Sequence, residues 1–105
     1  MARAPLSAPT REAVHLLGAS VAIGRRERGW TQRDLAERLG VSEVTVRKIE
    51  RGSPSVALGT ALEAAVLVGV PLFDPDPDRR ALEVARVADR LALLVDELGE
   101  ALDLA

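Results

Sequence analysis

Apolar residues recur every three or four positions along most of this chain, the spacing that predicts amphipathic α-helices. The first such run is made by Val14, Leu17, Val21 and Ala22. We expect its helix to begin at Thr10, whose hydroxyl can cap the first turn, and to end at Gly29. Gly18 and Gly24 each cost up to about 1 kcal/mol relative to alanine within a helix. They indicate close helix packing at those positions or a later start of the regular helix.

Two short helices follow the first one. Thr31 and Asp34 form the capping-box pattern at the start of a helix over residues 31–39. Ser42 offers a new N-cap shortly afterwards, for a helix over residues 42–51. A glycine follows each of these helices, where positive φ is tolerated and a helix can stop.

The junction between the two short helices carries small and apolar residues where a steep helix crossing needs them. These are Leu35, Ala36, Leu39, Gly40, Val41, Val46 and Ile49. The pattern predicts a helix-turn-helix motif. In that motif the second helix presents its N-terminal residues to base edges in the major groove, and the first helix lies across the DNA backbone.

The rest of the chain divides into three parts. Residues 57–68 form an almost wholly apolar fourth helix, which we expect at the centre of the core or at a dimer face. Alternating prolines and aspartates make residues 74–78 a stiff acidic linker. We therefore expect a flexible N-terminus over 1–9, a domain over 10–73 and a C-terminal helix over 79–105.

The C-terminal helix has apolar residues on two sides. Its broad face is formed by Val84, Ala88, Leu91, Val95, Leu98 and Leu102. A line on the opposite side consists of Leu82, Leu93 and Leu104. The broad face either covers the core of its own domain or forms a homodimer, and the leucine line is a weaker candidate for a second partner. The expected dimer or partner surface comprises Leu91, Leu93, Leu94, Val95 and Leu98.

Charge is distributed unevenly between the two halves of the chain. Residues 1–55 contain ten basic and six acidic residues, a net charge of +4, whereas residues 56–105 contain four basic and ten acidic residues, a net charge of −6. The overall value of −2 conceals this contrast. The basic half carries the predicted helix-turn-helix, as expected for a segment that binds DNA.

Composition excludes several classes of function. There is no cysteine, and His15 is the one histidine, so neither a disulfide framework nor a zinc site is expected. No apolar stretch approaches the roughly 20 residues that span a bilayer, and no secretory signal is apparent, which predicts a cytoplasmic protein without membrane contact. Without a nucleophile paired with a base, a phosphate-binding loop or a metal cluster, we expect no enzyme, no cofactor and no metal.

Taken as a block, several short motifs resemble the Xre-type, lambda-repressor-like helix-turn-helix family over about residues 17–73. They are Gly29-Trp30-Thr31-Gln32, Leu35-Ala36, Leu39-Gly40-Val41-Ser42, Thr45-Val46 and Ile49-Glu50-Arg51-Gly52. The resemblance implies an all-α, five-helix DNA-binding domain in which the last, long helix serves dimerisation or a partner. It also implies a dimeric repressor on a palindromic operator in double-stranded DNA.

The resemblance implies roles for individual residues as well. The base contacts would be Glu43, Val44, Thr45 and Lys48, and the phosphate contacts Gln32, Arg33, Ser42, Arg47 and Arg51. Arg25 would pair with Glu50 inside the domain, and each needs a partner because each lies on an otherwise apolar helical face. Trp30 is expected to pack over the start of the second helix, whereas Arg28 and Arg38 are expected to be solvated or to contact phosphates at the edge of the interface.

A looser similarity links Ser53-Pro54-Ser55 through Leu72-Phe73 to the HipB-like antitoxins. These small Xre proteins neutralise a HipA-type kinase toxin and repress their shared operon. The resemblance implies an autoregulatory antitoxin with a HipA-like kinase as partner. A stand-alone repressor and an adaptor that uses the same fold without binding DNA are the alternatives.

Overall fold

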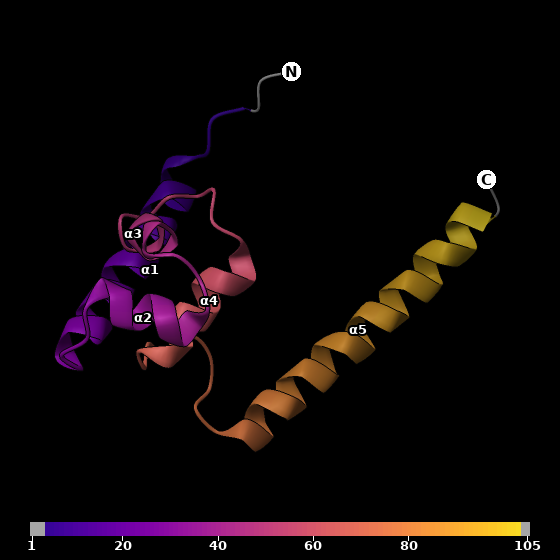
Figure 1. Cartoon of the computed structure of the whole chain (residues 1–105). Helices are drawn as coiled ribbons and strands as arrows, with labels where there is room; N and C mark the ends of the chain where they lie inside the picture. Colours follow the sequence, from indigo (N-terminus) through magenta and orange to yellow (C-terminus); the bar gives the residue numbers. More distant parts are fainter. Residues whose placement is uncertain (1–3, 104–105) are drawn as a thin grey trace. The chain divides into compact units, whose positions relative to one another are not determined.

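A computed structural model describes the backbone of residues 4–103 and the side chains of residues 4–96. The described chain forms five α-helices: α1 (Ala8–Glu27), α2 (Gln32–Leu39), α3 (Glu43–Glu50), α4 (Leu58–Leu67) and α5 (Pro77–Asp103) (Figure 1). The prediction of an all-α fold with five helices is confirmed. The chain divides into two compact units between Leu72 and Phe73, called the N-terminal unit and the C-terminal unit below.

The start of α1 differs from the sequence prediction. The helix begins at Ala8 and not at Thr10, and its N-cap is Ser7, whose hydroxyl accepts a hydrogen bond from the backbone N–H of Thr10. Pro9 therefore lies inside the first turn. Proline is accepted there because the N–H groups of the first turn have no partner within the helix.

The caps of α2 and α3 are confirmed. The Thr31 hydroxyl accepts the Asp34 N–H at 3.0 Å, and the Asp34 carboxylate accepts the Thr31 N–H at 2.8 Å, which completes the capping box. Gly40 ends α2 in the left-handed region at φ 72°. Ser42 then caps α3 by accepting the Thr45 N–H at 3.2 Å.

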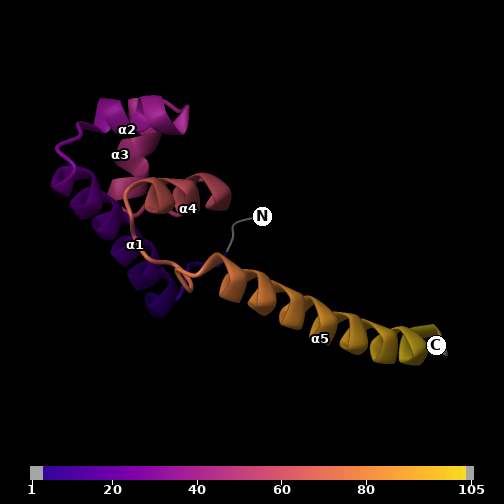
Figure 2. The same cartoon turned by 90° about the horizontal axis from the view of Figure 1, so that it is seen from below.

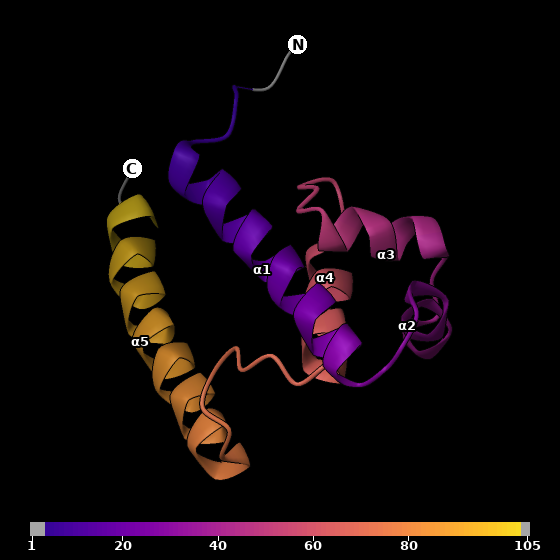
Figure 3. The same cartoon turned by 90° about the vertical axis from the view of Figure 1, so that its left-hand side faces the viewer.

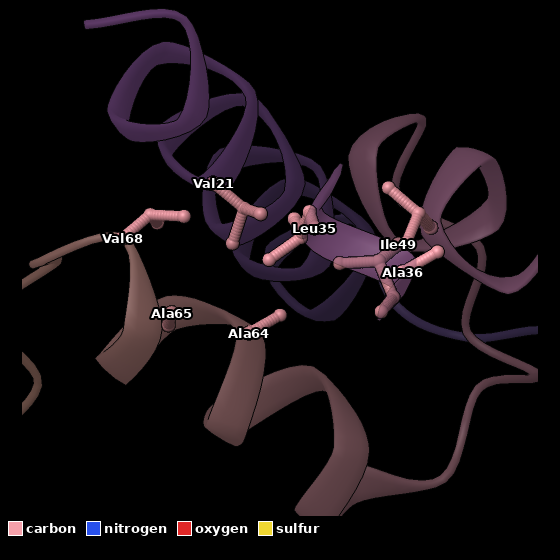
Figure 4. Packing of buried hydrophobic residues seen from close by; sticks show 8 residues of the cluster. Val21, Leu35, Ala36, Ile49, Ala64, Ala65 and Val68 are labelled. Carbon is pink, nitrogen blue, oxygen red and sulfur yellow. The ribbon is translucent and has the colours of Figure 1, made fainter. Parts of the chain in front are cut away.

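The core of the N-terminal unit is small and aliphatic (Figure 4). Its buried residues are Val21, Leu35, Ala36, Val46, Ile49, Ala64, Ala65 and Val68. They come from α1 to α4 and from the residue that follows α4, and α2, α3 and α4 gather on one side of α1 (Figures 2 and 3). Trp30 is half-buried and packs against this cluster, as predicted.

Gly18 and Gly24 on α1 lie where another part of the chain comes too close for a side chain. A Cβ at Gly18 would overlap the backbone carbonyls of Ile49 and Glu50, and a Cβ at Gly24 would overlap Val68. The close packing predicted from these glycines is confirmed. It brings the C-terminal end of α3 onto the backbone of α1.

The C-terminal unit consists of the linker and α5. The Asp76 carboxylate accepts the Asp78 N–H at 2.9 Å at the start of the helix, and Arg79 lies 3.9 Å from Asp74 and 3.8 Å from Asp76. Every side chain described in α5, from Pro77 to Asp96, is exposed. None of the helices, over the residues described, combines the length and apolar character needed to cross a membrane.

Candidate nucleic-acid interface

The turn between α2 and α3 fixes how the two helices cross. The Val41 N–H donates to the Ala36 carbonyl at 3.0 Å, which holds the chain against the end of α2 as it turns. Leu35 and Ala36 on α2 then pack with Val46 and Ile49 on α3, all four buried. With its apolar side in the core, α3 turns its other side outward.

The predicted base contacts lie on α3 but are not equally accessible. Glu43 and Val44 are exposed, Val44 at 49%. Thr45 and Lys48 are half-buried, and the Thr45 hydroxyl lies 3.1 Å from that of Ser42. The Glu43 carboxylate lies 3.5 Å from the Arg47 guanidinium one turn later, so this acidic group is partly neutralised within the helix.

A buried ion pair connects α1 to the end of α3. Arg25 donates to the Glu50 carboxylate through Nε at 2.6 Å and Nη2 at 2.9 Å, and its Nη1 donates to the Trp30 carbonyl at 2.8 Å. Both side chains are only 8% exposed. The hydrogen bond to Glu50 raises the pKa of Arg25 above its usual value, so the guanidinium stays charged.

Gln32 joins this network from the first turn of α2. Its side-chain amide donates to the Glu50 carboxylate at 3.2 Å. An amide nitrogen carries two N–H donors, so one remains for an oxygen outside the protein. Glu50 thus holds the Gln32 amide in place.

The other predicted phosphate contacts are exposed, and some are already occupied by neighbouring residues. Arg33 pairs with Glu37 at 3.3 Å on the surface, with both side chains more than two-thirds exposed. Arg51 is exposed at the C-cap of α3. The Ser42 hydroxyl serves as the α3 N-cap.

Two arginines have structural contacts that the sequence analysis missed. Arg28 donates to the Val68 carbonyl at 2.5 Å, which ties the end of α1 to the end of α4. Arg38 lies over the Trp30 ring, 4.0 Å from its centroid. Neither contact has a signal in the spacing of the sequence, since Arg28 and Val68 are 40 residues apart. The expectation that these arginines are simply solvated or at the edge of a DNA interface is incomplete.

The predicted dimer or partner residues belong to α5, in the C-terminal unit. Leu91, Leu93, Leu94 and Val95 are 59%, 66%, 46% and 55% exposed. Leu98 lies outside the residues whose side chains the structure describes. The C-terminal unit thus carries apolar side chains that its own residues leave uncovered.

Comparison with known protein families supports the geometry of α2 and α3. A family model described as helix-turn-helix matches residues 22–74, which is half of the chain. A search of curated proteins finds no match. The matched residues contain both helices of the motif, its turn, the Arg25–Glu50 pair and α4. The chain therefore belongs to the Xre/Cro-type helix-turn-helix family of DNA-binding transcriptional regulators, which are not enzymes.

Proposed function

We propose that the protein is a homodimeric repressor that binds a palindromic operator with α3 in the major groove. The single observation that carries the proposal is the division of α3 into two sides. Val46 and Ile49 are buried, and Glu43, Val44 and Arg47 face solvent. An outward polar face on a helix held rigidly by its neighbour is what base recognition requires.

Each candidate residue has a role that follows from its chemistry. Lys48 would donate to acceptors of guanine, Val44 would contact a thymine methyl group, and Glu43 would accept from a cytosine amino group. Thr45 would complete the base contacts. The phosphate contacts would be Gln32, Arg33, Ser42, Arg47 and Arg51.

The test is a binding titration of two variants on an operator selected from a random duplex library. Lys48→Ala should weaken specific binding by about 1–3 kcal/mol, because it removes a base contact. Arg51→Ala is the matched control from the same helix end. It should weaken specific and non-specific binding about equally and reduce the salt dependence by about one ion. Unchanged operator affinity of Lys48→Ala would remove this residue from the interface.

We propose a second role, as an antitoxin, on the basis of the apolar residues on the other side of α5. Leu82 is 51% exposed and Leu93 is 66% exposed, and both lie opposite the broad apolar face. A helix with two apolar sides has room for two neighbours, and the second would be a HipA-like kinase. Co-purification of an untagged kinase encoded beside this gene with the wild-type chain, and its loss with Leu93→Asp, would support the role. Without such a kinase the protein is a stand-alone repressor.

A further inference from the structure

The carboxylate of Glu50 binds two neighbours of different kinds. Its Oε2 accepts from Arg25 Nε at 2.6 Å, and its Oε1 accepts from Arg25 Nη2 at 2.9 Å and from the Gln32 amide at 3.2 Å. Arg25 is buried and donates to the Trp30 carbonyl as well. The carboxylate is thus held on both oxygens within the domain, whereas Gln32 is half-buried in the first turn of α2.

The contact with Glu50 determines which end of the Gln32 amide lies beside it. An amide side chain has a donor end, the NH2 group, and an acceptor end, the carbonyl oxygen. An ionised carboxylate only accepts hydrogen bonds, so it attracts the NH2 group and repels the oxygen. One N–H bond is directed at Glu50, and the second diverges from it and remains available to another acceptor. Without this anchor the amide would be free to turn over and put its oxygen where the NH2 group now lies.

We propose that Glu50 is a positioning residue of the DNA interface, because it fixes the Gln32 amide with its second N–H toward a DNA phosphate. This role rests on the proposed function, in which Gln32 contacts a phosphate. A phosphate oxygen, like a carboxylate oxygen, only accepts hydrogen bonds, so both need the NH2 end of the same amide. The Glu50 side chain is 8% exposed, so Glu50 acts through Gln32 and not by its own contact with DNA.

A comparison of variants in two backgrounds tests this role. Replacing Glu50 alone leaves Arg25 buried without a partner, so both are replaced together, as Arg25→Met with Glu50→Leu. Apolar residues of similar volume in place of a buried ion pair often leave a protein as stable as before. This apolar background lacks the acceptor for Gln32 and keeps the core filled. Its fold is checked by Trp30 fluorescence, and the DNA titrations are run below its melting temperature.

Affinity is measured on the selected operator and on an unrelated duplex. With the ion pair present, Gln32→Ala should weaken binding to both about tenfold for each bound copy, since it removes a hydrogen bond to a charged phosphate. In the apolar background the same substitution should cost only about twofold, because the amide no longer holds a donor toward the phosphate. Arg33→Ala is the matched control, in the same turn of α2 but paired with Glu37, and should cost the same in both backgrounds.

A second measurement needs no substitution. The chain contains one glutamine and no asparagine, so the Gln32 NH2 group gives the single carboxamide pair in a nitrogen–proton correlation spectrum. In the free protein one of its two protons should exchange slowly with water, because it is hydrogen-bonded to Glu50, and duplex DNA should slow the other. In the free apolar background neither proton should be slow.

The outcomes separate this role from the proposed function. Equal costs of Gln32→Ala in the two backgrounds, or two fast-exchanging Gln32 protons in the free protein, would overturn the role while operator binding stands. A smaller cost of Arg33→Ala in the apolar background would mean that the whole of α2 has moved, which would overturn the role as well. A wild-type chain that binds no duplex would contradict the proposed function, and this role with it.

Discussion

The two units of this protein treat apolar side chains in opposite ways. In the N-terminal unit, α2 and α3 have eight residues each, yet Leu35 and Val46 are fully buried. In the C-terminal unit, α5 has 27 residues and leaves Leu91 59% exposed. Helices of eight residues are too short to persist in water without tertiary contacts, whereas a helix of 27 residues can form by itself. The short helices of the first unit therefore depend on their contacts with one another, whereas the described part of α5 leaves its apolar side chains exposed.

The ion pairs of the two units also differ, since the N-terminal unit buries one and the C-terminal unit has its pairs on the surface. Arg25 and Glu50 are buried and share several hydrogen bonds that connect α1, α2 and α3. Arg79 meets Asp74 and Asp76 at longer distances on the surface, and only at the start of α5. Buried pairs are strongly coupled to the fold, while exposed pairs contribute little. The hydrogen bonds around Arg25 and Glu50 therefore help to fix the position of α3 against α1 and α2.

The largest effect should come from breaking the buried pair. Glu50→Ala leaves Arg25 buried without its partner and should lower the free energy of unfolding by about 3–5 kcal/mol. The matched control is Glu37→Ala, which removes the exposed partner of Arg33 and should cost less than about 0.5 kcal/mol. Urea unfolding followed by Trp30 fluorescence measures both. Similar values for the two variants would mean that burial does not govern the strength of these pairs.

The contrast between the units is tested by shortening one leucine in each. Leu35→Ala opens a cavity in the core and should cost about 2–5 kcal/mol in the same unfolding experiment. Leu91→Ala should change the unfolding of the N-terminal unit by less than about 0.5 kcal/mol, since this side chain is exposed in α5. A large cost for Leu91→Ala would show that α5 packs into the core.

The smallest effect concerns the α2 capping box and depends on pH. The backbone N–H and then the hydroxyl of Thr31 hold the pKa of Asp34 below its usual value of about 3.9. A carboxylate with a lowered pKa stabilises the fold above its unfolded pKa, and this stability is lost as the pH falls through the folded value. The difference in melting temperature between wild type and Asp34→Asn should stay constant from about pH 7 to 5 and shrink below about pH 4. A difference that persists unchanged at lower pH would contradict the role of the charge.

Features with local causes were predictable from the sequence. The capping box at Thr31 and the turn at Gly40 depend on residues within four positions of each other. The start of α1 was predicted wrongly because Ser7 and Thr10 are both competent caps, and Pro9 between them does not prevent a helix from starting earlier. The Xre-like motif block likewise predicted the family.

Features that depend on distant contacts were not predictable. Arg28 reaches Val68, and Arg38 reaches Trp30, through the way the helices pack. The Gln32 contact with Glu50 is of the same kind, because it needs the start of α2 beside the end of α3. The sequence identified Gln32 as a phosphate contact by resemblance and gave no sign that its amide is oriented within the protein.

The contact at Gly18 has a consequence for engineering new binding specificities. The end of α3 rests on α1 through backbone carbonyls, with no side chain of Gly18 between them. The position of α3 is therefore set by main-chain atoms and by its inner residues Val46 and Ile49. On the proposed function, exchanging the base contacts Glu43, Val44, Thr45 and Lys48 for those of another regulator would leave this contact between α1 and α3 intact. The proposed function therefore implies that the operator preference would change with the outward residues of α3, without a redesign of the rest of the domain.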